Sequence, residues 1–321
     1  MDNKSLIIII TYNSGGFIES CLESIVSQSY KNWDLLVIDN NSSDDTIKKI
    51  REFRNQAAWL DGQGIKLTRL KKNIGFAGAV NRAVFKIADA AGQGTYKYLI
   101  LLNPDISLFP DALERLVYTF GSPGIGAAGG LILEYDRDIV QHKSGKMTGN
   151  FITYHEGAGE EYKGTEAGNK NTIVESDYVT GAFFATPYSL FKDSGGFDRG
   201  YRPLYFEELD YCLRLREAGW RVVSNLGAAC RHFEGASVKK FSSRFYRHYH
   251  KNRLRCAILN MDMPDLLRIF IPAEIRWLKK EATRDQKVPL LYAYFINSLF
   301  FAYNLVLKIK NHFILNRIEL K

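Results

Sequence analysis

Cysteine is scarce in this chain of 321 residues. The four cysteines, Cys21, Cys212, Cys230 and Cys256, lie far apart, and no two of them form a C-x-x-C pair. This spacing supports neither a disulfide framework nor a zinc-finger pattern, and a reducing cytoplasm is the default compartment. Long apolar runs are scarce too. The stretch Leu290 to Leu307 is interrupted by polar residues and is borderline for spanning a bilayer.

The sequence also lacks a basic leader. Its first apolar run, Leu6 to Ile10, begins only a few residues in, and no convincing small-residue cleavage site follows it. We expect a buried strand here rather than a signal peptide. Apolar residues make up 46% of the chain and charged residues 24%. That balance is typical of a globular protein with a sizeable core, and it excludes disorder, collagen and fibrous repeats.

The formal net charge of +8 is concentrated late in the sequence. Residues 239–321 contain 17 basic and 6 acidic residues, whereas residues 1–238 have a slight acidic excess. This asymmetry predicts two parts, a domain over 1–238 and a basic, mainly helical region over 239–321. A basic tail suits an anionic membrane surface or nucleic acid. Because no recognised nucleic-acid-binding motif accompanies the charge, we expect no nucleic-acid partner.

Short apolar runs alternate with helical patterns through the first half, which predicts a parallel sheet with crossover helices. The predicted strands are Leu6 to Ile10, Trp33 to Ile38, Ile65 to Arg69 and Tyr98 to Leu102. The predicted helices are Phe17 to Gln28, Asp44 to Trp59 and Gly75 to Ala90. Ligands of such sheets bind at the carboxyl ends of the strands, where each predicted strand opens into a polar loop.

The second half is less regular. Residues Glu134 to Ser176 contain few periodic apolar side chains and predict a long excursion or irregular hairpins on the substrate side. Further along we predict a strand over Asp177 to Pro187, a helix over Tyr205 to Trp220 and a short strand over Arg221 to Ser224. The tail beyond Val238 is predicted to be mostly helical.

Polar loops follow the first three predicted strands and together would form a nucleotide pocket. They contain Thr11, Tyr12 and Asn13, then Asp39, Asn40, Asn41 and Ser42, and then Asn73, Ile74, Gly75 and Phe76. A buried Asp39 would accept a hydrogen bond from a pyrimidine ring, while loop amides and helix N-termini meet ribose and phosphate. Ordinary turn and capping chemistry is the alternative. The fingerprint G-x-G-x-x-G is absent after the first strand, which argues against a dinucleotide site.

The fourth predicted strand ends in Asn103-Pro104-Asp105 and delivers a carboxylate to the same edge. Mg²⁺ and Mn²⁺ prefer oxygen ligands and usually take one or two protein carboxylates plus phosphate oxygens. Asp105 is therefore a candidate metal ligand. The alternative is a simple turn built around Asn-Pro-Asp.

Three carboxylates, Glu207, Glu208 and Asp210, open the predicted helix. The helix macrodipole alone favours acidic residues there, and a general base is the functional interpretation. Upstream, the segment Gly195 to Asp198 predicts a mobile turn that shapes an acceptor pocket. Downstream, His232 is the histidine placed where a metal or phosphate would bind.

In this order along the chain, the segments resemble the family 2 inverting glycosyltransferases of GT-A fold, and among them the bacterial rhamnosyltransferase-like branch. The resemblance covers residues 5 to about 253. The ordered set is Thr11-Tyr12-Asn13, Asp39-Asn40, Asn73-Ile74-Gly75-Phe76 with Asn81, Asn103-Pro104-Asp105, Gly181-Ala182, Gly195-Gly196-Phe197-Asp198, Glu207-Glu208-Leu209-Asp210, His232 with Ser237, and Lys251-Asn252-Arg253. The resemblance implies an α/β fold with a mixed, mainly parallel sheet flanked by helices, and a helical C-terminal extension.

The resemblance also implies roles for individual residues. The donor would be a nucleotide sugar with a uridine or thymidine base, contacted by Asp39. Asp105 would bind the metal in a D-x-D-type motif, and His232 would bind the metal or the diphosphate. Glu208 would be the general base at a position where the family usually has Asp, with the adjacent Glu207 as the second candidate. The other donor-binding candidates are Thr11, Tyr12, Asn13, Asn41, Asn73, Gly75, Asn81 and Asn103.

The implied reaction is a single inverting displacement, with Mg²⁺ or Mn²⁺ as the Lewis acid and Glu208 as the base. We expect transfer of one sugar, L-rhamnose from dTDP-rhamnose, to a hydroxyl of a saccharide or lipid-linked saccharide in bacterial surface polysaccharide synthesis. The alternatives are another UDP- or dTDP-sugar (galactofuranose, glucose or N-acetylhexosamine), or a non-catalytic sugar-nucleotide-binding module. A processive synthase is not expected, because Ala273 to Trp277 lacks the Gln of Gln-x-x-Arg-Trp.

Aromatic and basic residues are mixed in the tail, over Asp265 to Lys280 and Leu290 to Leu307. Such a mixture suits helices lying in a membrane interface. It predicts a cytoplasmic protein held peripherally on the inner face of the cell membrane. A packing or homo-oligomer contact is the alternative.

Overall fold

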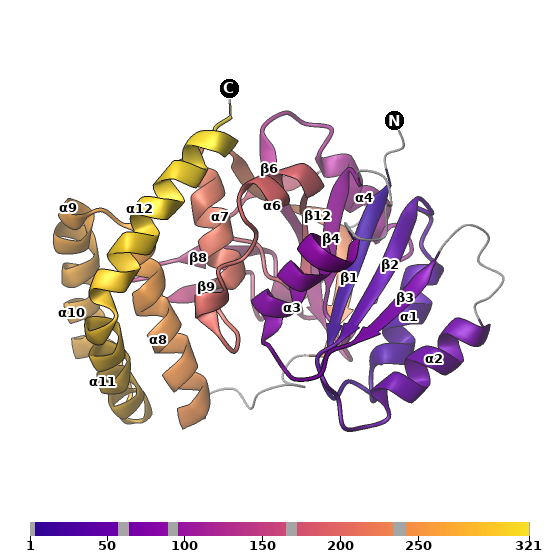
Figure 1. Cartoon of the computed structure of the whole chain (residues 1–321), viewed down its shortest axis with the longest axis horizontal. Helices are drawn as coiled ribbons and strands as arrows, with labels where there is room; N and C mark the ends of the chain where they lie inside the picture. The colour runs from indigo at the N-terminus through magenta and orange to yellow at the C-terminus, as the bar shows by residue number, and fades with distance from the viewer. Residues whose placement is uncertain (1–3, 57–63, 89–95, 165–171, 234–241, 321) are drawn as a thin grey trace.

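The computed structural model describes residues 4–56, 64–88, 96–164, 172–233 and 242–320. Its N-terminal half contains the four predicted strands as neighbours in one parallel sheet (Figure 1). They are β1 (Ser5–Thr11), β2 (Trp33–Asp39), β3 (Ile65–Arg69) and β4 (Tyr98–Leu102). The helices between them are α1 (Ile18–Val26), α2 (Thr46–Gln56) and α3 (Phe76–Arg82), which continues into η1 (Ala83–Ala88). Residues 57–59 and 89–90 of the predicted helices lie outside the described residues.

Strand β1 shows why this sheet is buried on both faces. Leu6 and Ile8 pack with the side chains of α3, whereas Ile7 and Ile9 pack with those of α1. Because successive side chains of a strand point to opposite faces, a continuous apolar run is what a strand covered by helices on both sides requires.

The sheet continues beyond β4 through strands that the sequence patterns describe less well. The full order is β10-β12-β6-β11-β4-β1-β2-β3, with β5 paired to β12 and β7 paired to β6. The added strands are β5 (Ile106–Leu108), β6 (Ile125–Glu134), β7 (Val140–His142), β10 (Ile173–Glu175), β11 (Phe183–Pro187) and β12 (Arg221–His232). Strand β11 runs antiparallel to both β4 and β6, so the sheet is mixed.

For these added strands, two predictions need correction, and strand β6 was not predicted. The predicted strand over Asp177 to Pro187 begins only at Phe183, and the short strand over Arg221 to Ser224 extends to His232. Strand β6 is absent from the prediction because its first half is glycine and alanine, which have low β-propensity. Close packing demands those small residues, since a Cβ atom on Gly130 would lie 2.2 Å from the carbonyl oxygen of Ala228.

The excursion between β6 and β11 contains a small second sheet, as irregular hairpins were expected. Its strands are β8 (Ser144–Met147) and β9 (Thr153–Glu156), which pair antiparallel. The remaining helices described before residue 234 are α4 (Ala112–Thr119), α6 (Tyr188–Asp193), η3 (Arg199–Tyr201) and α7 (Glu207–Glu217). Helix α7 thus occupies the middle of the predicted helix over Tyr205 to Trp220.

The tail is helical, as predicted, and gathers at one end of the molecule, opposite β1 to β3 (Figure 1). Its elements are α8 (Ser243–Asn260), α9 (Met263–Asp265), η4 (Leu266–Phe270), α10 (Ile271–Lys280), α11 (Arg284–Leu299) and α12 (Phe301–Ile318). Leu254 and Leu315 belong to the same buried cluster as Leu6. The expected domain boundary at 238/239 and Ser237 lie outside the described residues.

No single helix among those described combines the length and the apolar composition needed to cross a membrane. Helices α11 and α12 meet that test only as a pair, and they are bent by 69° at the break between them.

Candidate active site

One cavity of about 770 Å³ lies at the carboxyl ends of the parallel strands and reaches the C-terminal helices. Eight predicted site residues line it together: Tyr12, Asn73, Gly75, Asn103, Asp105, Glu207, Glu208 and His232. The predicted metal ligand and the predicted base therefore face one space, as a single reacting centre requires. Neither Lys nor Arg lines this cavity within the described ranges.

Asp105 and His232 meet because of strand pairing. Ile106 at the start of β5 pairs with His232 at the end of β12, which puts Asp105 Oδ1 3.4 Å from His232 Nε2. The Asp105 side chain is only 9% exposed, and its Oδ1 has no hydrogen-bond partner in the part of the chain that the structure describes. A buried carboxylate oxygen without a donor is costly unless something else binds it.

The imidazole of His232 is oriented by a residue that the sequence patterns do not indicate. Its Nδ1 lies 2.7 Å from the acceptor Gln141 Oε1, so in the neutral ring Nδ1 donates to that oxygen and Nε2 carries the lone pair. Asn103 Nδ2 lies 3.4 Å from that Nε2. Metal-bound histidines have this arrangement, with one nitrogen free for the ion and the other hydrogen-bonded to an orienting partner. Across the described ranges no group of three His, Cys, Asp or Glu side chains forms a metal site, so this pair supplies two ligands at most.

Glu207 and Glu208 are presented by an unusual turn before α7. Tyr205 and Phe206 have φ of 78° and 77°, which is left-handed backbone that bulky residues rarely adopt. The buried Asn252 of α8 fixes this turn, because its Nδ2 lies 2.7 Å from the Tyr201 carbonyl oxygen and 2.9 Å from that of Tyr205. Helix α8 therefore helps to position the first turn of α7.

The two glutamates differ in their surroundings. Glu208 is half-buried, and its Oε1 accepts from Gly181 N at 3.3 Å. Glu207 is 3% exposed, and its Oε2 has no partner within the described part of the chain. Burial raises the pKa of both carboxyls, and the neighbouring Glu208 raises the pKa of Glu207 further. A carboxyl with a raised pKa is a stronger base once ionised, as proton abstraction requires.

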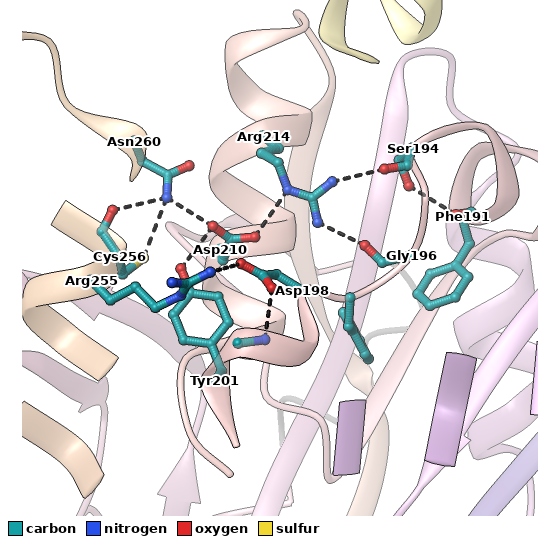
Figure 2. A network of polar contacts seen from close by, with 12 residues as sticks. Phe191, Ser194, Gly196, Asp198, Tyr201, Asp210, Arg214, Arg255, Cys256 and Asn260 are labelled. Carbon is teal, nitrogen blue, oxygen red and sulfur yellow. Dashed lines mark hydrogen bonds and ion pairs between the residues drawn. The ribbon is translucent and has the colours of Figure 1, made fainter. Parts of the chain in front are cut away.

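Asp210, the third carboxylate of this turn, lies outside the cavity in a closed polar network (Figure 2). It accepts from Tyr201 Oη at 2.9 Å, from Arg214 Nε at 3.0 Å and from Asn260 Nδ2 at 2.9 Å. Both carboxylate oxygens of Asp210 are hydrogen-bonded within the protein, so Asp210 has a structural role.

The segment Gly195 to Asp198 corrects an expectation. It belongs to the same network and does not line the cavity, because Gly196 O accepts from Arg214 and Asp198 pairs with Arg255 at 2.5 Å (Figure 2). The turn that was predicted to shape an acceptor pocket therefore connects helices α7 and α8 through its hydrogen bonds and its ion pair.

Five predicted donor-binding residues do not line the cavity: Thr11, Asn13, Asp39, Asn41 and Asn81. Asp39 is fully buried and accepts from Thr11 Oγ1 at 3.1 Å and from Ser42 N at 3.0 Å. Asn13 accepts from Ser43 N at 2.8 Å, and Asn41 adopts φ of 74°.

The side-chain amide of Asn81 donates a hydrogen bond to the carbonyl oxygen of Phe197 and accepts one from the Phe197 N–H. The contacts of Asp39 match the turn and capping chemistry that was the alternative interpretation of its loop, whereas Asn81 lies within α3 and joins that helix to the segment at Phe197. Asn40, in contrast, lines the cavity, and its Nδ2 donates to Asn73 Oδ1 at 3.0 Å.

The far end of the cavity is formed by tail residues that were not predicted as site residues. They are Phe245, Tyr246, Tyr249 and His250 of α8, Trp277 of α10 and Gln286 of α11. The spacing of Tyr246, Tyr249 and His250 on one helix face was a usable signal. Trp277 and Gln286 gave none, because only the tertiary packing brings their helices to the site.

Comparison with known proteins identifies the family of this chain. A profile described as glycosyl transferase family 2 matches residues 6–194, and the chain belongs to that family. The protein is a glycosyltransferase, and several of the curated relatives that it resembles are named rhamnosyltransferases. An N-acetylglucosaminyl-diphospho-decaprenol L-rhamnosyltransferase of Mycobacterium tuberculosis is 25% identical over 77% of this chain and 81% of its own length. Rhamnosyltransferase WbbL of Escherichia coli is 25% identical over 78% of this chain and 90% of its own.

Solved structures agree on the fold. The crystal structure of GalNAc-T7 with UDP, GalNAc and Mn²⁺ aligns with a TM-score of 0.61 at 15% identity, over 92% of this chain and 57% of that one. A Pyrobaculum calidifontis mannosyltransferase with GDP-Man and Mn²⁺ aligns with a TM-score of 0.56 at 17% identity, over 93% and 75%. The expected GT-A arrangement of a mixed sheet with flanking helices is confirmed.

Proposed function

We propose that this glycosyltransferase moves L-rhamnose from dTDP-rhamnose, with inversion, to a hydroxyl of a saccharide or lipid-linked saccharide in bacterial surface polysaccharide synthesis. The observation that carries the proposal is one cavity in which an unpartnered Asp105 carboxylate beside His232 faces a pair of raised-pKa glutamates. The rhamnosyltransferase names of the relatives favour this sugar, and the mycobacterial relative suggests an N-acetylglucosaminyl-diphospho-polyprenol acceptor.

The residues at the strand ends fit a divalent cation, Mg²⁺ or Mn²⁺. Asp105 Oδ1 and His232 Nε2 would hold it, and Gln141 would keep the imidazole in the required tautomer. When bound, the ion supplies Lewis-acid stabilisation of the departing diphosphate. Among the described residues, no Lys or Arg lines the cavity to balance the negative charge of that diphosphate. A bound cation would supply the positive charge.

We assign Glu208 as the general base. Its carboxylate lies in the cavity wall and is half-buried, and the Gly181 amide holds one oxygen, which leaves the other for a substrate hydroxyl. Glu208 would take the proton of the acceptor hydroxyl as that oxygen attacks the anomeric carbon from the face opposite the diphosphate. Glu207 is too deeply buried to be the first candidate.

A donor screen tests the proposal. The purified protein is incubated with Mn²⁺, an N-acetylglucosaminyl-diphospho-farnesol acceptor and dTDP-rhamnose, UDP-galactofuranose, UDP-glucose or UDP-N-acetylglucosamine, and the released nucleoside diphosphate is measured. We expect release of nucleoside diphosphate with dTDP-rhamnose. In the product, the anomeric configuration of the rhamnose should be opposite to that in the donor. Faster release with a UDP-sugar would change the sugar and keep the reaction. A retained anomeric configuration would refute the single displacement.

We further propose that the tail rests on the cytoplasmic face of the membrane. Seventeen large apolar side chains between Met263 and Leu320 are exposed, among basic residues such as Lys279 and Lys280. A patch of this kind marks an interaction surface, and the basic residues favour anionic lipid. Co-sedimentation with phosphatidylglycerol vesicles should fall after Leu291→Ser with Phe295→Ser. Self-association without vesicle binding would instead identify a homo-oligomer contact.

A further inference from the structure

The aromatic end of the cavity is not explained by the donor, the cation or the base. We define the acceptor wall as Tyr246, Tyr249, His250 and Trp277, all of which line the cavity. The wall connects to the catalytic turn through ring contacts. Phe206, which precedes the glutamates, lies 5.2 Å from Tyr249 between ring centroids, Tyr249 lies 5.3 Å from His250, and His250 lies 5.5 Å from Trp277.

His250 has an unused hydrogen-bond donor in this wall. The residue is 1% exposed, and its Nδ1 accepts from Arg253 Nε at 3.3 Å, so the proton of the neutral ring is on Nε2. That Nε2 has no partner within the described ranges. Burial, with Arg253 nearby, lowers the pKa of His250 to about 3, so the ring is neutral at pH 7. A buried N–H without an acceptor favours a ligand that brings an oxygen.

The wall carries no free positive charge for a phosphate. Arg253 lies behind it and is used completely: its guanidinium pairs with Glu274 at 2.6 and 2.7 Å and donates to Asn150 O at 2.6 Å. The wall therefore combines aromatic faces with a neutral donor. This chemistry matches a neutral saccharide, whose apolar ring faces contact aromatic rings while its hydroxyls hydrogen-bond.

We infer that the acceptor wall binds the neutral saccharide ring of the acceptor, the ring whose hydroxyl faces Glu208. The inference rests on the proposed function for its assignment to the acceptor. It gives the α8 and α10 helices a direct role in acceptor recognition, in addition to their part in fixing the catalytic turn.

The binding test needs no turnover, so it can fail independently of the proposed reaction. Octyl N-acetyl-β-D-glucosaminide is added to the full chain, and saturation-transfer NMR measures which of its protons contact the protein. We expect saturation of the pyranose ring protons, and the signal should persist when dTDP and Mn²⁺ are added. Saturation of the octyl chain alone would identify a lipid site. Displacement by dTDP would assign the wall to the donor, and no saturation would exclude the subsite.

Variants locate the contact. Trp277→Leu and His250→Phe should each weaken binding of the glycoside about tenfold, the second while keeping an aromatic ring. Tyr294→Phe is the matched control, because it removes a 2.5 Å hydrogen bond to the same Glu274 but does not line the cavity. We expect its affinity to stay within about twofold of the wild type. Equal weakening in the control, or wild-type affinity in both wall variants, would overturn the inference. Circular dichroism confirms folding of each variant.

Discussion

Two groups of carboxylates lie within one turn of α7, and they have opposite environments. Asp210 is buried among donors from three other side chains, and both of its oxygens are hydrogen-bonded. Glu207 and Glu208 face the cavity, and Glu207 Oε2 has no donor in the described part of the chain. Asp105 resembles Glu207, since its Oδ1 also has no partner among the residues that the structure describes.

The comparison separates structure from chemistry on a single helix. A satisfied buried carboxylate stabilises the fold, because its hydrogen bonds and its ion pair exist only in the folded state. A buried carboxylate that lacks hydrogen-bond donors lowers the free energy of unfolding. A protein retains such a group where a substrate or an ion supplies the missing contacts. Substitutions that remove charge at each position should therefore affect different observables.

The largest effect is expected for Glu208→Gln. Turnover should fall about a thousandfold, because the amide cannot take the proton from the hydroxyl of the acceptor saccharide. Donor binding and the melting temperature should stay unchanged. Release of nucleoside diphosphate measures turnover. The same substitution at Glu207 is the matched control and should retain more activity. Turnover of Glu208→Gln within tenfold of the wild type would remove this residue from the role of base.

Asp210→Asn should act on stability instead. The buried Arg214 would lose its carboxylate partner, at a cost of about 3 kcal/mol in the free energy of unfolding. Urea denaturation measures the change, and Asp193→Asn on the surface of α6 should stay within about 0.5 kcal/mol of the wild type. If Asp210→Asn kept full stability but lost turnover, the division between the two groups would be wrong.

Asp105→Asn should weaken Mn²⁺-dependent donor binding about tenfold, because one anionic ligand becomes a neutral amide. Calorimetric titration with dTDP, with and without Mn²⁺, measures the difference. Asp111→Asn, outside the cavity, should not change it. Equal binding of dTDP by the Asp105 variant at all Mn²⁺ concentrations would argue against a cation at this position.

The smallest effect concerns the pH dependence of stability. Because burial raises the pKa of Glu207 in the folded state, the folded protein binds this proton more tightly than the unfolded chain does, and wild-type stability falls as the pH rises above the ordinary glutamate pKa. Glu207→Gln should therefore be more stable than the wild type by about 1 kcal/mol at pH 8, with the difference vanishing near pH 4. The exposed Glu52→Gln should show no such trend. A constant difference at both pH values would contradict the assignment.

Sequence patterns predicted β1, β2 and β4 closely because these strands are buried on both faces and consist mainly of apolar residues. They failed at β6, where close approach of β12 and Phe183 requires glycine instead of β-branched residues. Residue type and position identified Asp105, His232 and the acidic turn from Glu207 to Asp210 as candidates, and the family resemblance singled out Glu208. They gave no hint of Gln141, whose role depends on an irregular excursion that returns to His232.

The sequence by itself determined the alternation of strands and helices, the polar strand ends and the acidic first turn of α7, because these features depend on local periodicity and on residue chemistry. Only the tertiary structure decided which polar groups are satisfied. Asp39 and Asp105 both lie at the carboxyl end of a buried strand. Backbone and hydroxyl donors bind the first, while the β5–β12 pairing places the second beside a histidine in the wall of the cavity. Hydrogen-bond satisfaction depends on partners distant in sequence, and only packing brings those partners together.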